Sequence, residues 1–451
     1  MKYATLLISS ITFFTSCNVP NDGHKQSEVI SSFGEQLSVA NGPQDEVVIT
    51  FGNQESIYYA ISSDEGATFN EPSAIATLDG LALGYSSGPN IAITPKYTVI
   101  TAPDTLGNLY AWNKPHYEEI WTGPFRINDV NASAGEWLSD VTATPDGKLF
   151  CTWIDTRFLD ESSHDNHSAT PDSHQVKPPS QNGSDELSKM TPLGITVGEL
   201  YKKIGEVPEN AHLAFHDDNN GNLLWVFFDK DKNVLKAENF EEYKKFRARN
   251  GERVATKGKI YISSSDDGGQ TWSKSKMIYK SPDGSVCECC KPTITSDTEG
   301  NVIVMFRNNI NGSRDLHFTK SMDNGETFSQ VEKLGIGTWK INGCPMDGGG
   351  LTVDQNGLLK TIWQRKGEVF VSSSSATEQK IGPGRSPSIA ARNDQSYMVF
   401  SKGEDIMSYN SNNSAPTKIG NGSAPKVLAI NEGAVYFWVN SEGIRSKKIL
   451  N

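Results

Sequence analysis

The sequence predicts an all-β fold assembled from repeated four-stranded units, and two periodic patterns indicate it. An octet of the form Ser-x-Asp-x-Gly-x-Thr-aromatic occurs at 62–69, 265–272 and 321–328. A second unit recurs along the chain and consists of an X-Pro step, an apolar strand, a Gly or Asn turn and another apolar strand. Patterns that repeat at intervals of roughly 40 to 50 residues are typical of proteins in which each repeat is one β-unit.

Each octet has the residue types of a tight turn between two strands. The Asp can accept hydrogen bonds from backbone amides two residues on, the Gly supplies a positive φ, and the aromatic ring packs inward as an anchor. The octet resembles the Asp-box of sialidase-type β-propellers. This resemblance implies a β-propeller whose Asp-boxes lie between the third and fourth strands of their blades. The Asp-box is a scaffold turn, so it implies no particular reaction.

The X-Pro units set the expected number of blades. They begin at Gly88-Pro89, Lys291-Pro292, Cys344-Pro345, Ser386-Pro387 and Ala424-Pro425, and a related unit begins at Ser139-Asp140. With the first Asp-box unit they give seven candidate blades, beginning near residues 35, 85, 136, 287, 341, 384 and 422. The last unit has three strand-like runs, so we expect an N-terminal strand to complete it. Six blades, the number in sialidases, stay the alternative.

One stretch interrupts the repeat between Arg157 and Lys259. Its first part, 159–190, is polar and cannot bury enough apolar surface to fold alone, so we expect it to be disordered. The sequence of 196–199 has the pattern of a capping box and predicts a short helix through Ile204. A strand over 223–228 and a second helix over 239–249 follow. We expect 159–256 to be a small α/β insertion in the third blade of a propeller domain spanning 35–451.

The first residues have the pattern of a targeting signal. An apolar run over 3–14 is too short to span a bilayer, and it leads into Phe14-Thr15-Ser16-Cys17, which resembles the lipobox of bacterial lipoproteins. This resemblance implies a removed signal peptide over 1–16, a lipid on Cys17 and a flexible tether over 17–34. We therefore expect lipid anchoring to the bacterial cell envelope, at the outer membrane or cell surface. An ordinary secretory signal is the alternative.

The charge of the chain excludes one class of partner. The formal net charge is −12 and the pI is near 5.3. A nucleic-acid partner requires a basic face, so we expect none. We expect contact with a membrane only through the N-terminal lipid.

In a propeller the loops between second and third strands, and between blades, open on one face, which we call the mouth. Arginines follow the second strand of three consecutive predicted blades, and such a set is suited to gripping a carboxylate. Sialidases hold their sugar acid with an arginine triad, so the resemblance implies an analogous site. The alternative is that each arginine pairs with a neighbouring carboxylate to hold loops together. The candidate substrate-binding residues are Arg157, Arg307, Asn308, Arg314 and Arg365.

Four carboxylates at the predicted mouth are candidates for acid, base or nucleophile in glycoside hydrolysis: Asp140, Asp155, Asp347 and Glu368. Two departures from sialidases count against this chemistry. The Phe-Arg-Ile-Pro signature of that family does not precede the first Asp-box, and the partial match at 125–128 lies elsewhere in the chain. No Tyr-Glu nucleophile pair can be identified.

Five cysteines follow Cys17, and four of them fall at the predicted mouth: Cys287, Cys289, Cys290 and Cys344. In an oxidising envelope they are expected to form disulfides, and a bridge from the 287–290 cluster to Cys344 would join the fourth blade to the fifth. The alternative is a soft-metal site for copper or zinc. Cys151 falls within a predicted strand and is expected in the core. No cofactor is required by the pattern, and the metal ion is the single cofactor considered.

These features lead to one expected function and one alternative. We expect an envelope-anchored, sialidase-like propeller that binds an acidic, sialic-acid-type glycan or glycoconjugate. If it is an enzyme, it is a glycoside hydrolase of exo-sialidase type, in which the arginines neutralise the substrate carboxylate while two mouth carboxylates perform the chemistry. The alternative is a non-catalytic binding or assembly propeller whose cysteine cluster is structural or holds a soft metal.

Overall fold

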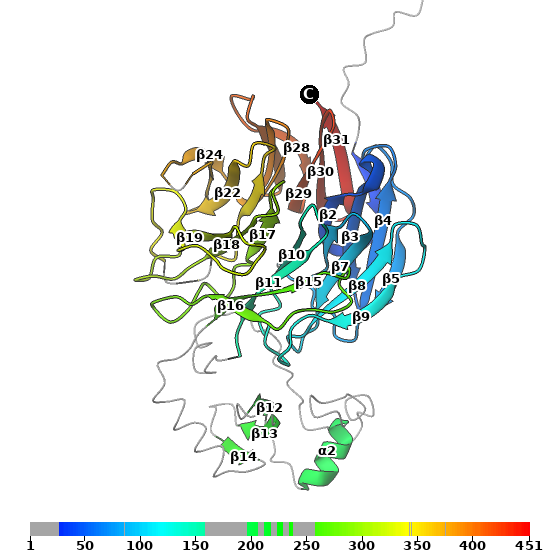
Figure 1. Ribbon diagram of the computed structural model, residues 1–451, viewed down its shortest axis with the longest axis vertical. Helices are drawn as coiled ribbons and strands as arrows, with labels where there is room; N and C mark the ends of the chain where they lie inside the picture. The colour runs from blue at the N-terminus through cyan, green and yellow to red at the C-terminus, as the bar shows by residue number, and fades with distance from the viewer. Residues whose placement is uncertain are drawn as a thin grey trace, which may run out of the picture.

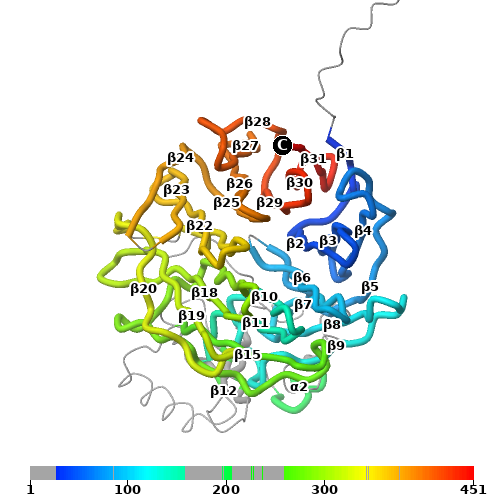
Figure 2. The backbone as a smooth tube through the Cα atoms, turned by 45° about the horizontal axis from the view of Figure 1, so that its top comes forward, coloured from blue at the N-terminus to red at the C-terminus, as the bar shows by residue number. Residues whose placement is uncertain are grey.

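The computed structural model describes residues 27–84, 86–157, 196–205, 212–217, 223–228, 234–237, 258–341, 343, 345–374 and 376–451. Within these ranges seven four-stranded antiparallel sheets, the blades, lie around a common centre (Figures 1 and 2). The fold is therefore a seven-bladed β-propeller, and the favoured blade count is confirmed.

The blades are numbered in chain order, and their strands are given from the centre outward. Blades 1 to 3 contain β2 (Glu35–Asn41), β3 (Val47–Asn53), β4 (Ser56–Ser62) and β5 (Ser73–Thr77); β6 (Asn90–Ile93), β7 (Tyr97–Pro103), β8 (Leu109–Pro115) and β9 (Thr122–Arg126); and β10 (Ser139–Ala143), β11 (Leu149–Asp155), β15 (Lys259–Ser265) and β16 (Lys276–Tyr279). Blades 4 and 5 contain β17 (Thr293–Ser296), β18 (Val302–Arg307), β19 (Leu316–Ser321) and β20 (Glu332–Lys333); and β21 (Gly350–Val353), β22 (Leu359–Arg365), β23 (Glu368–Ser372) and β24 (Gln379–Pro383). Blades 6 and 7 contain β25 (Arg385–Arg392), β26 (Gln395–Lys402), β27 (Asp405–Asn410) and β28 (Thr417–Asn421); and β29 (Ser423–Ile430), β30 (Gly433–Asn440), β31 (Gly443–Leu450) and β1 (Glu28–Ser31).

The core is divided among the contacts between neighbouring blades. Seven clusters of buried apolar side chains are found in the described residues, each shared by two adjacent blades. Both faces of a blade are therefore buried, which explains why second strands such as β3, Val-Val-Ile-Thr-Phe-Gly-Asn, have nearly continuous apolar sequences. At the centre, the first strands of all seven blades contact one another in a closed ring.

The last blade is completed by the start of the chain. Strand β1 pairs antiparallel with β31, with Glu28 opposite Ser446 and Val29 opposite Arg445. The three C-terminal strands alone would leave the outer edge of blade 7 unpaired. The expected N-terminal strand is thus confirmed, but it lies within the segment 17–34 that was predicted to be a tether, so the propeller begins before residue 35.

The three octets lie between the third and fourth strands of blades 1, 3 and 4, as the Asp-box resemblance implies. In the first, the Ser62 hydroxyl donates to Asp64 at 2.7 Å, and the Thr68 amide and hydroxyl donate to the same carboxylate at 2.8 and 2.7 Å. The amide bound by the Asp is four residues on, not two as expected. Ser62 spans the turn instead, because its oxygen accepts from the Gly66 amide at 2.7 Å.

Each octet also packs against the preceding blade. Phe69 joins the apolar cluster shared by blades 1 and 7, which confirms the aromatic anchor. Gly66 has a φ of +83°, and a Cβ at this position would lie 2.5 Å from Val435 Cγ2 in β30. Glycine is therefore required here both by the backbone conformation and by the neighbouring blade.

The insertion leaves the propeller between β11 and β15, the second and third strands of blade 3, as expected. It contains α2 (Val197–Ile204), which begins at Thr196 with the predicted capping box. A three-stranded sheet of β12 (His212–Asp217), β13 (Leu223–Phe228) and β14 (Val234–Ala237) follows, and β13 is the predicted strand.

Several predictions fall outside the described residues: the signal peptide, Cys17 and most of the tether, the segment 159–190, the second helix of the insertion, and Cys344. They stay predictions. Among the residues that the structure does describe, no helix has the length and apolar character needed to cross a bilayer.

Candidate functional site

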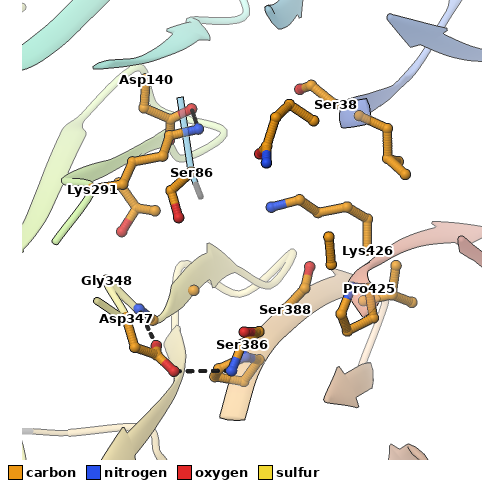
Figure 3. A pocket seen from close by; sticks show the side chains of 18 of the residues that line it. Ser38, Ser86, Asp140, Lys291, Asp347, Gly348, Ser386, Ser388, Pro425 and Lys426 are labelled. Carbon is orange, nitrogen blue, oxygen red and sulfur yellow. Dashed lines mark hydrogen bonds and ion pairs between the residues drawn. The ribbon is translucent and has the colours of Figure 1, made fainter. Parts of the chain in front are cut away.

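A polar cavity of about 530 Å³ lies at the centre of the propeller, on the face where the innermost strands begin. Every blade contributes to it through the start of its first strand or the segment just before. The Asp-boxes follow third strands and are therefore on the opposite face. Four ionisable side chains in the cavity wall carry the argument that follows: Asp140, Lys291, Asp347 and Lys426 (Figure 3).

On one side of the cavity, Lys291 connects three blades. Its Nζ lies 3.3 Å from Asp140 Oδ1 in β10 and donates to Asn90 Oδ1 in β6 at 2.5 Å. The second oxygen of Asp140 accepts from the Ile294 amide in β17 at 3.1 Å. Both charges of this pair are therefore compensated within the protein.

Asp347 occupies the wall formed by blades 5 and 6. Its carboxylate accepts from the amides of Gly349 at 3.1 Å and Ser386 at 2.9 Å, and the side chain is buried. Two backbone donors satisfy the carboxylate without a cation. This arrangement ties the start of β21 to the start of β25.

Lys426 is different, because none of the described residues forms an ion pair or hydrogen bond with its ammonium group. The side chain extends from the start of β29 into the cavity (Figure 3). Burial, and then repulsion by Lys291, lower the pKa of Lys426 to about 8, against attraction by Asp140 and Asp347. The cavity thus contains an ammonium group without a counter-charge, and this group loses its proton at a lower pH than an ordinary lysine does.

The predicted substrate-binding arginines do not line this cavity. Arg157 binds Asp155 through Nε and Nη2, both at 2.7 Å, and Arg365 binds Glu378 at 2.8 and 2.5 Å. The hydrogen bonds from Arg365 lower the pKa of Glu378 to about 2. These contacts are those of the alternative role, in which arginines hold loops together, and the role in substrate binding stays a prediction.

Arg307 is buried and joins blade 4 to blade 5 through three backbone carbonyls. Its guanidinium donates to Asp347 O at 2.9 Å, Arg314 O at 2.6 Å and Gln364 O at 3.1 Å. The neighbouring candidate Asn308 is also buried and donates to the Tyr279 hydroxyl at 2.5 Å. Both side chains are engaged within the protein.

Of the four candidate carboxylates, the cavity brings together Asp140 and Asp347. Asp155 is buried elsewhere, against Arg157 and the Trp153 indole N–H, which donates to it at 3.0 Å. Glu368, at the start of β23, pairs with Lys380 at 2.9 Å and is not part of the cavity wall. The structure thus reduces the candidate pair for acid and base chemistry to Asp140 and Asp347.

The two lysines are functional candidates that sequence reasoning missed. Each is adjacent to one of the X-Pro steps, in Lys291-Pro292 and Pro425-Lys426. These steps mark the entry to the innermost strands, so a charged residue beside one of them points to the centre of the propeller. The X-Pro repeat therefore already contained the signal that identifies these two lysines.

The Cys-x-Cys-Cys segment lies just before β17 and beside the cavity. Cys287 Sγ is 3.4 Å from Cys290 Sγ and 3.6 Å from Cys289 Sγ. A hydrogen bond from Cys290, followed by the positive charges of Arg314 and Arg307, lowers the pKa of Cys287 to about 7, although burial opposes this. Burial, with the nearby Glu288 and Cys287, raises the pKa of Glu136 to about 7.

The described cysteines differ in their oxidation state. Cys289 is disulfide-bonded, whereas Cys287, Cys290 and Cys151 are free thiols. Cys151 is fully buried in β11, as expected for a core residue. The expected bridge to Cys344 falls on a residue outside the described ranges and stays a prediction.

Comparison with known proteins gives one family match along the sequence. The model of the BNR repeat-like domain matches residues 228–344, a range that includes two of the three Asp-boxes. Over that range the chain is similar to BNR repeats, and its fold is that of a β-propeller. A search of curated proteins found no significant match.

Comparison with solved structures gives matches at low sequence identity, and the first of those below shares the fold. The BP39L lectin from Burkholderia pseudomallei matches with a TM-score of 0.52 and 11% identity, over 92% of this chain and 96% of the lectin. An α-L-arabinanase from Penicillium chrysogenum complexed with arabinobiose matches with a TM-score of 0.45 and 10% identity, over 94% and 97% of the two chains. The intramolecular trans-sialidase from Ruminococcus gnavus matches with a TM-score of 0.39 and 10% identity, over 93% and 94%.

Proposed function

We propose that this propeller binds an acidic glycan in its central cavity, with Lys426 as the cation that receives the sugar acid. The observation that carries the proposal is the unpaired ammonium group of Lys426 in a polar cavity of about 530 Å³. A buried or half-buried charge is costly without a partner, so an anionic ligand gains more from this lysine than from one exposed to water.

The rest of the cavity wall suits a sugar. Ser38, Ser86 and Ser388 add hydroxyl groups to the wall, and hydroxyls pair readily with the alternating donors and acceptors of a carbohydrate (Figure 3). Volumes of several hundred Å³ are typical of small-ligand sites. The fold neighbour named as a lectin supports the use of such a propeller for binding by analogy of fold alone.

A second function, hydrolysis of the bound glycan, is favoured by one observation. Asp140 and Asp347 both line the cavity, and glycoside hydrolysis uses a pair of carboxyl groups. Both carboxylates already accept backbone hydrogen bonds, which is compatible with either a structural or a catalytic role. Binding without hydrolysis therefore remains the primary proposal.

The test is a calorimetric binding measurement with 3′-sialyllactose and tri-galacturonate, using lactose as the neutral comparison. We expect the acidic sugars to bind, the Lys426→Met variant to lose at least tenfold in affinity, and Lys402→Met, an exposed lysine in β26, to bind as the wild type does. Equal affinities for acidic and neutral sugars, or an unchanged Lys426→Met variant, would overturn the proposal.

Hydrolysis is tested separately with fluorogenic sialosides. Release that is lost in the Asp140→Asn variant, while binding of 3′-sialyllactose is retained, supports an enzyme. Binding without release leaves the propeller as a glycan receptor. The predicted anchoring through Cys17 is a third proposal, tested by mass spectrometry for a lipid that is absent from Cys17→Ser.

A further inference from the structure

Two thiols and one disulfide sulfur meet beside the central cavity, on the segment that enters blade 4. Cys287 Sγ lies 3.4 Å from Cys290 Sγ and 3.6 Å from Cys289 Sγ, and all three sulfurs lie within 4.8 Å of one another. Cys287 and Cys290 are free thiols, whereas Cys289 is disulfide-bonded. One thiol, Cys287, is therefore in contact both with a second thiol and with the sulfur of a disulfide.

The three sulfurs differ in their access to solvent. Cys287 and Cys290 are 0% and 1% exposed, whereas Cys289 is half-buried. The backbone fixes this arrangement, because the Cys290 amide donates to Cys287 O at 3.2 Å and the Cys287 amide donates to Arg307 O at 2.8 Å. A molecule in solution can therefore meet the disulfide at Cys289, while the two thiols lie behind it.

The surroundings give the two thiols different properties. A hydrogen bond with Cys290, and then the positive charges of Arg314 and Arg307, lower the pKa of Cys287 to about 7, although burial opposes this. Burial, and then the hydrogen bond with Cys287, raise the pKa of Cys290 well above its ordinary value. In thiol–disulfide exchange the thiolate attacks, and a thiol whose pKa is near the ambient pH is the best attacking group. Cys287 thus has the properties of an attacking thiol, and Cys290 those of a thiol that reacts second.

We propose that Cys287 and Cys290 are a redox-active pair that reduces the Cys289 disulfide by thiol–disulfide exchange and thereby supplies two electrons to a disulfide in another molecule. The contact of Cys287 with a sulfur on each side carries the proposal. The two thiols also have the Cys-x-x-Cys spacing that occurs in disulfide oxidoreductases. This site is separate from the proposed glycan site and does not depend on it.

The exchange has two steps and needs no further oxidant. In the first, Cys287 loses its proton and attacks Cys289 Sγ; a Cys287–Cys289 bond forms, and the sulfur previously bonded to Cys289 leaves and takes up a proton. In the second, Cys290 loses its proton and attacks Cys287 Sγ, and Cys289 leaves and is protonated. Two thiols have then become a disulfide, and one disulfide has become two thiols. These outer thiols reduce a disulfide of another molecule to two thiols as their own disulfide forms again.

The test is to incubate the full chain, with its Cys289 disulfide intact, with N-ethylmaleimide in the absence of oxygen, metal ions and reductant. Maleimide traps thiols irreversibly, and exchange is the one source of a thiol at Cys289 under these conditions. We expect peptide mass mapping without reduction to find maleimide on Cys289 and a disulfide between Cys287 and Cys290. Maleimide on Cys287 or Cys290, or none on Cys289, would overturn the proposal, and the wild type alone decides this.

Variants test which thiol attacks. In Cys287→Ser the labelling of Cys289 should be at least tenfold slower than in the wild type. Cys151→Ser is the matched control, because Cys151 is also a buried free thiol but lies in β11. It should be labelled at Cys289 as fast as the wild type. A Cys287→Ser variant that is labelled at the wild-type rate would overturn the role of Cys287.

The supply of electrons to another molecule is measured with dithiobis-nitrobenzoate, an aromatic disulfide that releases a coloured thiol when it is reduced. We expect two equivalents of this thiol from each wild-type chain, because the inner pair supplies two electrons, and none from Cys287→Ser. No release from the wild type, or equal release from the variant, would overturn the transfer to other molecules.

Discussion

The two faces of the propeller use polar residues in opposite ways. On one face the aspartates of the three Asp-boxes are bound by residues of their own turns, as Asp64 is bound by Ser62 and Thr68. In the central cavity on the other face, polar partners come from different blades, and Lys426 has no partner among the described residues. Polar groups that are satisfied within their own turn serve the fold, whereas a cavity with an uncompensated charge is prepared for a ligand.

The largest effect is expected from Arg307. This residue lies on the mouth side, but its guanidinium is hydrogen-bonded within the protein, as the Asp-box carboxylates are. Arg307→Met keeps the volume but leaves three buried carbonyls without donors, at about 1–3 kcal/mol each. We expect the free energy of unfolding to fall by about 3 kcal/mol or more in denaturant titrations. Arg392→Met removes an exposed pair with Asp45 and should cost less than about 1 kcal/mol. Equal effects for the two variants would contradict a scaffold role for Arg307.

The next effect tests the Asp-box face. Gly66→Ala places a Cβ against Val435 at a φ of +83°, whereas Gly300→Ala has the same φ with no atom within 4 Å. The unfavourable φ should destabilise both by about 1 kcal/mol, and overpacking should add about 1–3 kcal/mol for Gly66 alone. Thermal unfolding of the two variants measures the difference. If the two variants have the same melting temperature, the stability of the Asp-box turn does not depend on its contact with blade 7.

A smaller effect, about tenfold in affinity, is expected from pH at the mouth. The folded pKa of Lys426 is about 8, below its ordinary value of 10.5, so its charge is lost as pH rises through 8. Binding of 3′-sialyllactose should be constant up to pH 7 and weaken above pH 8, and the residual binding of Lys426→Met should not change with pH. Because the unfolded chain keeps this proton up to a higher pH than the folded protein does, the free energy of unfolding should rise as the pH increases from 8 to 10.5, where the cost of burying the charged Lys426 is relieved. A wild-type binding profile that is flat to pH 9.5 would remove Lys426 from the site.

The smallest effect concerns one hydrogen-bonded carboxylate of the Asp-box face. Asp267→Ala removes the acceptor for the Thr271 amide at 2.9 Å and hydroxyl at 2.6 Å. Because the turn is exposed to solvent, we expect a loss of about 1 kcal/mol. The adjacent Asp266→Ala is the control, since Asp266 is 78% exposed and makes a single long contact of 3.9 Å with Lys148. Chemical unfolding that ranks Asp266 above Asp267 would refute this assignment of roles.

The sequence was sufficient for features that depend on neighbours along the chain. The octets, the capping box at Thr196 and the seven blades all rest on short-range patterns, and the structure contains each of them. Even the missing strand of blade 7 was predictable, because a three-stranded last unit requires a partner.

Features that depend on distant partners were not predictable to the same degree. The sequence predicted that Arg365 binds the carboxylate of a ligand, but its guanidinium binds Glu378, 13 residues away in the chain. Lys291 takes its partners from β6 and β10, and Lys426 is distinguished by having none. Whether a charge is compensated depends on three blades at once, and no pattern along one strand records that.

The pairing of β1 with β31 delays closure of the ring until blade 7 has been synthesised. Roughly 400 residues separate the two strands, and ribosomes add about 5–20 residues per second, so β1 must wait some 20–80 s for its partner. Throughout that interval blade 1 lacks its neighbour on one side, and the apolar face it will share with blade 7 stays open. Strand β1 has only four residues and begins with Glu28, so it is a poor template for pairing with strands of other chains. This property suits a strand that stays unpaired until β31 has been made.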